Sequence, residues 1–221
     1  MGIVYSTSKL LARADFRVLA RWRVEGQEAV PPRGPLLVVS NHLSNADPPL
    51  LIASLPRRIS FMAKRGLFTK PVVGFLLRAL GSYPLDRNSR DRGALKWTLQ
   101  LLQEEKAVTI FPEGTRSPGG LRQGHPGVAY LALKSMAPIL PVAVTGTESI
   151  GPLWRVPLPL CSMKVSIGLP FSLPTIEGEL TRPLLQHLTD LIMQRIAMLL
   201  PESYRGYYRT QPSQVSERPS S

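Results

Sequence analysis

His42 and Asp47 stand five residues apart and have the side chains that proton transfer requires. An imidazole titrates near neutral pH, and a carboxylate that accepts one of its N–H groups fixes the tautomer and leaves the other nitrogen free. The pair predicts a general base, His42, oriented by Asp47, which contributes about 10²- to 10⁴-fold in rate. Two other interpretations share this spacing. One is a surface turn with a helix cap, and the other is a metal site, which lacks a second His or Cys nearby.

The flanking residues predict where this pair lies in the fold. Residues 36–39 are an uninterrupted apolar run, typical of an interior strand of a parallel sheet. Asp47 and the two prolines that follow it indicate the start of a helix. His42 is therefore expected on the loop after the carboxyl end of a strand, where open α/β sheets bind their ligands.

A second candidate site residue is Arg87, which ends the strand-like segment that begins at Gly81 and contains Pro84. A guanidinium pairs with phosphate through two parallel hydrogen bonds. Arg87 is accordingly either an anion-binding group or a solvated loop charge.

A third motif, from Phe111 to Ser117, begins at the end of the predicted buried strand 107–111, again at the exit of a strand. Its glycine permits close approach of the backbone to a ligand, and the next two residues offer a hydroxyl and a cation. Glu113 is suited either to orienting an arginine or to accepting a hydrogen bond from a substrate hydroxyl. Taken alone, the motif also fits a salt-bridged turn. The candidate binding residues here are Glu113, Gly114, Thr115 and Arg116.

Composition restricts the possible partners. Lysine and arginine number 27 against 15 acidic residues, a net charge of +12, which calls for an anionic partner such as nucleic acid, anionic lipid or a phosphorylated small molecule. The absence of a dense basic run or zinc-finger spacing makes nucleic acid a minor alternative. No stretch without charge reaches the ~18 residues of a membrane span, so no transmembrane helix or secretory signal is expected. The single cysteine, Cys161, fits a reducing compartment.

The ends of the chain differ in composition from its middle. Residues 1–24 mix apolar and basic residues in the pattern of an amphipathic helix, which suits either membrane docking or ordinary packing. The apolar segment 66–80 is typical either of a core helix or of a helix that touches lipid or lines an acyl-chain channel. Residues 209–221 are rich in Ser, Pro and Gln and are expected to be disordered, which leaves 25–208 as the main domain.

Alternating strand and helix patterns predict an α/β fold. We expect a mostly parallel central sheet flanked by helices on both faces, with an N-terminal amphipathic helical element. Helices are expected at 92–106, 128–135 and 181–200, and further strands at 59–63, 107–111, 140–144 and 163–168.

The three polar motifs and an apolar block around Pro141 occur in the order found in the glycerolipid acyltransferase family. Over roughly residues 24–200 the sequence resembles this family, specifically the bacterial 1-acylglycerol-3-phosphate acyltransferases. Asn41, His42, Ser44 and Asp47 match the pattern N-H-x-S-x-x-D, and the third motif is complete. Joint occurrence of three polar motifs is highly specific.

The resemblance implies an enzyme that transfers an acyl chain to the sn-2 hydroxyl of lysophosphatidic acid, giving phosphatidic acid. The donor is an acyl thioester, either acyl-coenzyme A or acyl-acyl carrier protein, and neither a metal nor another cofactor is implied. His42 becomes the general base and Asp47 its orienting group. The acceptor site comprises Arg87, Glu113, Gly114, Thr115 and Arg116.

Two departures from the family pattern modify these expectations. A long apolar N-terminal span is replaced by the basic segment 1–24, which predicts peripheral attachment to an anionic surface at the cytoplasmic face of the membrane. After the third motif, Arg122 is a candidate phosphate contact and His125 is expected to cap the following helix. Another lysolipid acceptor, such as lyso-ornithine lipid or a lysophospholipid, remains an alternative, as does a non-catalytic lipid-binding relative.

Overall fold

A central sheet runs through the computed structural model, which describes residues 2–86 and 91–209. Over these residues the sheet has seven strands in the order β1-β7-β6-β2-β5-β3-β4. Strands β2 to β6 run parallel, β7 is antiparallel to β6, and β1 is parallel to β7. This topology confirms the mostly parallel sheet. The strands are β1 Arg21–Glu25, β2 Leu36–Ser40, β3 Ile59–Lys64, β4 Tyr83–Leu85, β5 Ala107–Ile110, β6 Ile139–Thr145 and β7 Ser162–Ile167.

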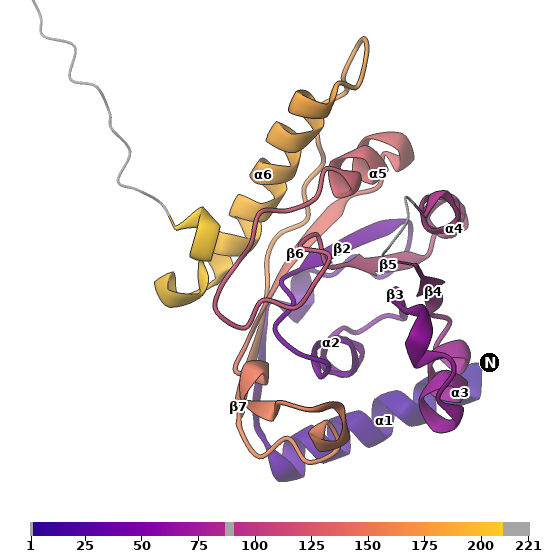
Figure 1. Ribbon diagram of the computed structural model, residues 1–221, viewed down its shortest axis with the longest axis vertical. Coiled ribbons are helices and arrows are strands. Elements are labelled where there is room, and N and C mark those ends of the chain that lie inside the picture. The colour runs from indigo at the N-terminus through magenta and orange to yellow at the C-terminus, as the bar shows by residue number, and fades with distance from the viewer. Residues whose placement is uncertain (1, 87–90, 210–221) are drawn as a thin grey trace, which may run out of the picture.

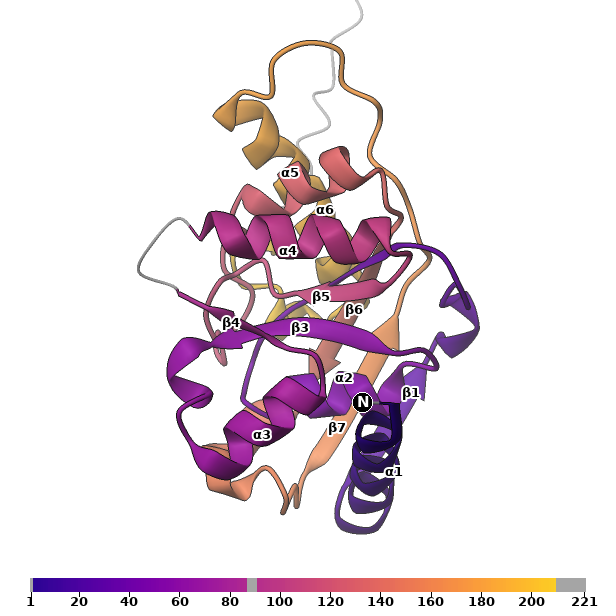
Figure 2. The same cartoon turned by 90° about the vertical axis from the view of Figure 1, so that its right-hand side faces the viewer.

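Helices cover both faces of this sheet, as expected (Figures 1 and 2). The face below the sheet in Figure 2 carries α1, α2 and α3, and the opposite face carries α4, α5 and α6. Their bounds are α1 Gly2–Leu19, α2 Asp47–Ser54, α3 Pro71–Ala79, α4 Arg92–Gln103, α5 Gly127–Ser135 and α6 Arg182–Leu199.

Strand β2 is the centre of both hydrophobic cores. Side chains alternate along a strand, so Leu36 and Val38 face α1 and α2 while Leu37 and Val39 face α4, α5 and α6. All four of these side chains are fully buried. The continuous apolar run in the sequence is therefore explained by burial on both faces, and it fixes the loop that follows β2.

The N-terminal segment differs from the expected helix over 1–24. The helix ends at Leu19, and β1 pairs in parallel with β7. Half-buried Trp22 and Val24 alternate with exposed neighbours, which is the period of a strand rather than of a helix. Helix α1 is itself anchored, because Phe16 is only 1% exposed and the Tyr5 hydroxyl accepts the backbone N–H of Ile59 at 3.0 Å.

Two further expectations concern the membrane and the C-terminus. Within residues 2–86 and 91–209, no helix combines the length and apolar character needed to cross a bilayer. The expected disordered tail, 209–221, lies outside the described residues from position 210 onward. Residues 201–209 are described and form two short 3-10 turns, Glu202–Tyr204 and Gly206–Tyr208, which lie against the loop after β5.

Candidate active site

The loop between β2 and α2 brings His42 and Asp47 into contact. His42 Nδ1 lies 2.7 Å from Asp47 Oδ2. The same carboxylate oxygen accepts the backbone N–H groups of Leu43 at 2.7 Å and Ser44 at 2.8 Å. Asp47 is completely buried, and His42 is 8% exposed. The carboxylate thus closes one tight turn and orders the backbone together with the imidazole ring.

The other carboxylate oxygen of Asp47 is held by Thr147, a residue that sequence reasoning missed. The Thr147 hydroxyl donates to Asp47 Oδ1 at 2.5 Å, and both residues are fully buried. Thr147 lies on the loop after β6, the strand that pairs with β2. The sequence offers one signal for it, its position just after the predicted strand 140–144, because 100 residues separate the two side chains.

These contacts indicate which ring nitrogen of His42 carries the proton. An ionised carboxylate only accepts hydrogen bonds, so Nδ1 carries the proton and Nε2 has a free lone pair. No group in the described part of the chain hydrogen-bonds to Nε2. The ring stacks on Phe111, with centroids 4.2 Å apart and planes inclined by 21°. The imidazole is therefore fixed from two directions and has one nitrogen available to accept a proton.

Asn41 fixes the start of this loop on the neighbouring strand. Its amide nitrogen donates to the carbonyl of Val144 at 2.8 Å, and its amide oxygen accepts the N–H of Val144 at 2.7 Å. This two-point contact explains the asparagine in the first motif as a structural anchor. The carboxyl ends of β2 and β6 are thereby joined immediately beside His42.

Glu113 joins the loop of His42 to the loop after β5. Its Oε1 accepts the backbone N–H of His42 and its Oε2 accepts that of Arg122, each at 2.9 Å. The pKa of the Glu113 carboxyl is raised above its usual value, because the effect of burial exceeds the opposite effect of the hydrogen bonds that it accepts. The backbone N–H of Ser117 also donates to the carbonyl of His42 at 2.7 Å. The carboxylate of Glu113 thus connects the loop after β2 to the loop after β5 through hydrogen bonds from their backbone N–H groups.

Thr115 and Arg116 line a cavity of about 350 Å³. Its wall also includes Pro118 of the same loop, and residues from the loops after β2 and β6, namely Leu43, Ser44, Glu148 and Gly151. The Arg116 side chain belongs to an exposed residue, so its guanidinium is accessible to an anion. The loops at the carboxyl ends of three adjacent strands, β6, β2 and β5, therefore form this cavity, and its lining includes Leu43, the residue after His42.

Gly114 lies in the tight turn before these two residues. It has a φ of +66°, a left-handed conformation, and a β-carbon there would lie 2.8 Å from Cδ2 of His125. The expectation that His125 caps α5 is wrong. Pro126 stands at the N-cap position without a side-chain hydrogen bond, and the His125 ring lies against Gly114 instead.

Arg87 lies outside the described residues, so its predicted role remains a prediction.

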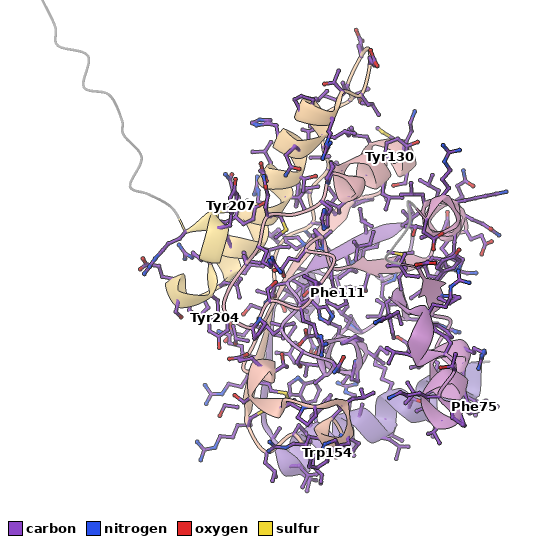
Figure 3. The ribbon with its side chains drawn as sticks, in the orientation of Figure 1. Phe75, Phe111, Tyr130, Trp154, Tyr204 and Tyr207 are labelled. Atoms are coloured by element: carbon purple, nitrogen blue, oxygen red, sulfur yellow. The ribbon has the colours of Figure 1, made fainter. Side chains whose placement is uncertain are left out.

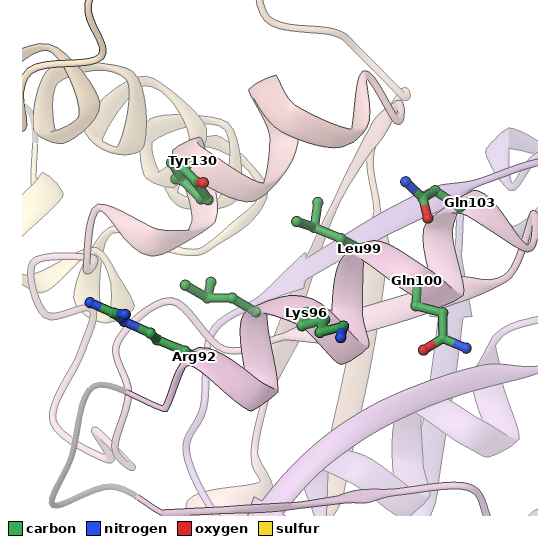
Figure 4. A pocket seen from close by; sticks show the side chains of 7 residues that line it. Arg92, Lys96, Leu99, Gln100, Gln103 and Tyr130 are labelled. Carbon is green, nitrogen blue, oxygen red and sulfur yellow. The ribbon is translucent and has the colours of Figure 1, made fainter.

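A second cavity, of about 620 Å³, lies on α4 with Tyr130 of α5 at its side (Figure 4). It contains no residue of the sequence motifs. Its lining residues are Arg92, Leu95, Lys96, Leu99, Gln100, Gln103 and Tyr130.

Three curated relatives show what this chain is similar to. It is 28% identical over 178 residues to a 1-acyl-sn-glycerol-3-phosphate acyltransferase of Bacillus subtilis, covering 80% of this chain and 87% of that one. A chloroplastic 1-acyl-sn-glycerol-3-phosphate acyltransferase of Brassica napus is 34% identical over 66% of this chain and 43% of its own length. The lyso-ornithine lipid O-acyltransferase of Pseudomonas aeruginosa is 34% identical over 62% and 51%. The chain thus spans less than half the length of the plant relative.

A solved structure and a family model extend these similarities to the fold. The crystal structure of the 1-acyl-sn-glycerophosphate acyltransferase from Thermotoga maritima superposes with a TM-score of 0.69 and 26% identity, covering 88% of this chain and 78% of that one. The model of the family described as "Acyltransferase" matches residues 21–145, which include His42, Asp47 and the third motif. The chain therefore belongs to the acyltransferase family.

Proposed function

We propose that this chain transfers an acyl group from an acyl thioester to the sn-2 hydroxyl of 1-acylglycerol-3-phosphate. The observation that carries the proposal is the buried His42–Asp47 pair, with Nε2 unengaged in the described residues, beside a cavity lined by Arg116. The names of the relatives from Bacillus subtilis and Brassica napus support this reaction class. The product is phosphatidic acid.

The proposed chemistry needs one proton acceptor and no covalent enzyme intermediate. His42 Nε2 takes the proton of the sn-2 hydroxyl while the hydroxyl oxygen attacks the thioester carbonyl carbon. The tetrahedral intermediate collapses, the C–S bond breaks, and the imidazolium returns the proton to the departing thiolate. The buried Asp47 carboxylate stabilises the imidazolium that forms during attack.

We propose Thr115 and Arg116 as contacts for the acceptor phosphate, with Arg87 as a second cation. A hydroxyl donor and a guanidinium match the acceptor oxygens of a phosphate monoester. Glu113 acts in this proposal through the two loops that it joins, since both of its oxygens already accept backbone hydrogen bonds. Gly114 permits the turn that presents the two binding residues.

The substitution Arg116→Gln tests the phosphate contact. Loss of a charge-assisted hydrogen bond is expected to raise KM for 1-acylglycerol-3-phosphate about 10- to 100-fold. KM for the acyl thioester should stay near the parent value. Arg182→Gln, an equal charge change at the start of α6, is the matched control. An equal rise of KM for the acceptor in both variants would contradict a specific contact.

We also propose that the protein docks peripherally on anionic lipid at the cytoplasmic face of the membrane. Large exposed apolar side chains lie on α1, on α3 and on the loop between β6 and β7. Figure 3 shows Phe75 and Trp154 at the end of the molecule where α1 lies. Such a cluster beside basic residues fits the interfacial region of a bilayer. The set is Ile3, Leu10, Leu11, Val18, Val72, Phe75, Leu76, Trp154, Leu158 and Leu160.

The substitution Leu10→Ser tests this docking surface without disturbing the core, because Leu10 is 68% exposed. Removing one leucine from the interface is expected to weaken binding to liposomes that contain phosphatidylglycerol by about 10-fold. Met198→Ser on α6, at a side chain of similar exposure, is the control. Sedimentation with liposomes measures both variants, and unchanged binding of Leu10→Ser would contradict the proposed surface.

A second acceptor, lyso-ornithine lipid, is the alternative within the same chemistry. It is supported by the 34% identity to the enzyme of Pseudomonas aeruginosa that carries this name. If it were the acceptor, Arg116→Gln would have a smaller effect on its KM than on that of a phosphate monoester. Parallel assays of the two lysolipids with coenzyme A and acyl carrier protein donors distinguish these cases.

A further inference from the structure

Glu148 lies in the cavity but belongs to none of the polar motifs. It follows Thr147, whose hydroxyl holds Asp47, so Glu148 and the residue that contacts the His42–Asp47 pair share the loop after β6. Glu148 lines the same 350 Å³ cavity as Thr115 and Arg116. A carboxylate and a guanidinium therefore both contribute to the wall of the proposed acceptor site.

The two carboxylate oxygens of Glu148 have different environments. Oε1 accepts a hydrogen bond from the Tyr204 hydroxyl at 2.5 Å. Oε2 is buried, and no partner for it occurs among residues 2–86 and 91–209. Folded proteins pair nearly all buried polar atoms, because a carboxylate oxygen without a donor loses its hydration and gains nothing in return. Because Glu148 lines the cavity, a ligand bound there is a source of the missing donor for Oε2.

A segment far along the chain fixes the orientation of this carboxylate. The carbonyl of Tyr204 accepts the N–H of Leu121 at 2.9 Å, and the N–H of Tyr207 donates to the carbonyl of Leu121 at 2.8 Å. The hydroxyl of Tyr208 contacts the N–H of Gly124 at 3.1 Å. Figure 1 shows this C-terminal segment, residues 201–209, in yellow beside α6. It thereby connects the loops after β5 and β6.

The Tyr204 hydroxyl is a stable donor in this arrangement. Burial, together with the neighbouring Glu148 carboxylate, raises the pKa of Tyr204 to about 12. The phenol therefore stays protonated at neutral pH and holds Oε1. With Oε1 engaged by Tyr204, only Oε2 remains for a ligand.

We propose that Glu148 determines which lysolipid binds as the acyl acceptor. The headgroup of that lysolipid donates a hydrogen bond to Oε2 of Glu148, and its anionic group pairs with the guanidinium of Arg116. Tyr204 is the positioning residue that orients Glu148. This inference rests on the proposed acyl transfer to a lysolipid. The matching headgroup carries both an anionic group and a donor. A phosphate monoester with one protonated oxygen fits, as does an anionic headgroup with an ammonium group. A phosphodiester that has neither of these two hydrogen-bond donors does not fit.

Equilibrium binding of three lysolipids in non-ionic micelles tests this proposal. The ligands are 1-acylglycerol-3-phosphate, its methyl phosphodiester and 1-acylglycerol-3-phosphoethanolamine. In Glu148→Gln, the amide keeps one oxygen for Tyr204 and presents a donor in place of the acceptor. We expect at least about 10-fold weaker binding of a ligand that has the matching donor, and little change for the methyl diester.

Two further variants separate orientation from a general structural effect. Here the selectivity ratio is the affinity for the ligand with the matching donor divided by the affinity for the methyl diester. Tyr204→Phe removes the hydroxyl that holds Oε1, so it should lower this ratio by a smaller factor than Glu148→Gln does. Glu202→Gln lies in the same segment, where its carboxylate contacts Arg209 at 2.9 Å on the surface, and it should leave the ratio unchanged. Should Glu148→Gln fold poorly, Tyr204→Phe still tests the proposal through this ratio.

The outcomes identify the donor or overturn the proposal. Loss of binding confined to the monoester assigns the protonated phosphate, and loss confined to the ethanolamine lipid assigns the ammonium group. Equal loss for all three ligands, or no loss for any, overturns the specificity role of Glu148. Binding requires no turnover, so absence of acyl transfer in a separate assay would refute the proposed function and leave this test valid.

Discussion

The substitution His42→Ala is expected to lower kcat for acyl transfer by about 10²- to 10⁴-fold, because it removes the proposed proton acceptor. Lysolipid binding should persist, since the cavity is lined by other residues. The backbone N–H and carbonyl of His42 carry the contacts with Glu113 and Ser117, and alanine retains both groups. The fold is therefore expected to survive the change, apart from the lost stacking on Phe111.

Steady-state kinetics of the parent and two histidine variants measures this effect. His187→Ala changes an exposed histidine of α6 and should have parent activity, which controls for the loss of an imidazole elsewhere. Circular dichroism and lysolipid binding would verify that His42→Ala is folded. Activity of His42→Ala above about a tenth of the parent would refute the general-base role, because it would lie outside the range for such a group.

Removal of the Asp47 carboxylate should impair both stability and catalysis. In Asp47→Ala, the N–H groups of Leu43 and Ser44, the Thr147 hydroxyl and His42 Nδ1 lose their acceptor. Buried donors without partners cost about 1–3 kcal/mol each, and such losses are not additive. We expect the free energy of unfolding to fall by roughly 3 kcal/mol or more, measured by urea denaturation.

The variant Asp47→Asn separates these two roles. Its amide has nearly the same volume but offers only one acceptor oxygen, so the preferred tautomer of His42 is lost. We expect kcat to fall by about 10²-fold or more with a smaller loss of stability than in Asp47→Ala. Parent activity in Asp47→Asn would contradict the orienting role. Equal loss of stability in both variants would contradict the hydrogen-bond account of the loop.

Local sequence patterns were sufficient to predict the main strands and the sheet type. The run 36–39 predicts β2 because burial on both faces requires continuous apolar residues. The H-x4-D spacing predicts a contact that one turn of loop can close, and the structure places the two side chains 2.7 Å apart. By contrast, the pattern of residues 21–24 predicts part of a helix where the structure has β1, because basic and apolar residues mixed over so few positions fit either period.

Contacts between distant segments were beyond sequence reasoning. Thr147 reaches Asp47 and Tyr204 reaches Glu148 across separations of 100 and 56 residues. No local spacing encodes either pair, because both depend on which strands become neighbours in the sheet. The two backbone hydrogen bonds of Glu113 were missed for the same reason, since residue type alone favours a substrate or arginine contact.

The most direct test of the central claim is transfer of labelled palmitate from a thioester to 1-acylglycerol-3-phosphate. Coenzyme A and acyl carrier protein serve as donors in separate reactions, with lyso-ornithine lipid and lysophosphatidylcholine as parallel acceptors. The proposed function predicts that the parent forms phosphatidic acid in preference to the other products and that His42→Ala does not. Absence of transfer to 1-acylglycerol-3-phosphate from both donors, or equal transfer by His42→Ala, would contradict it.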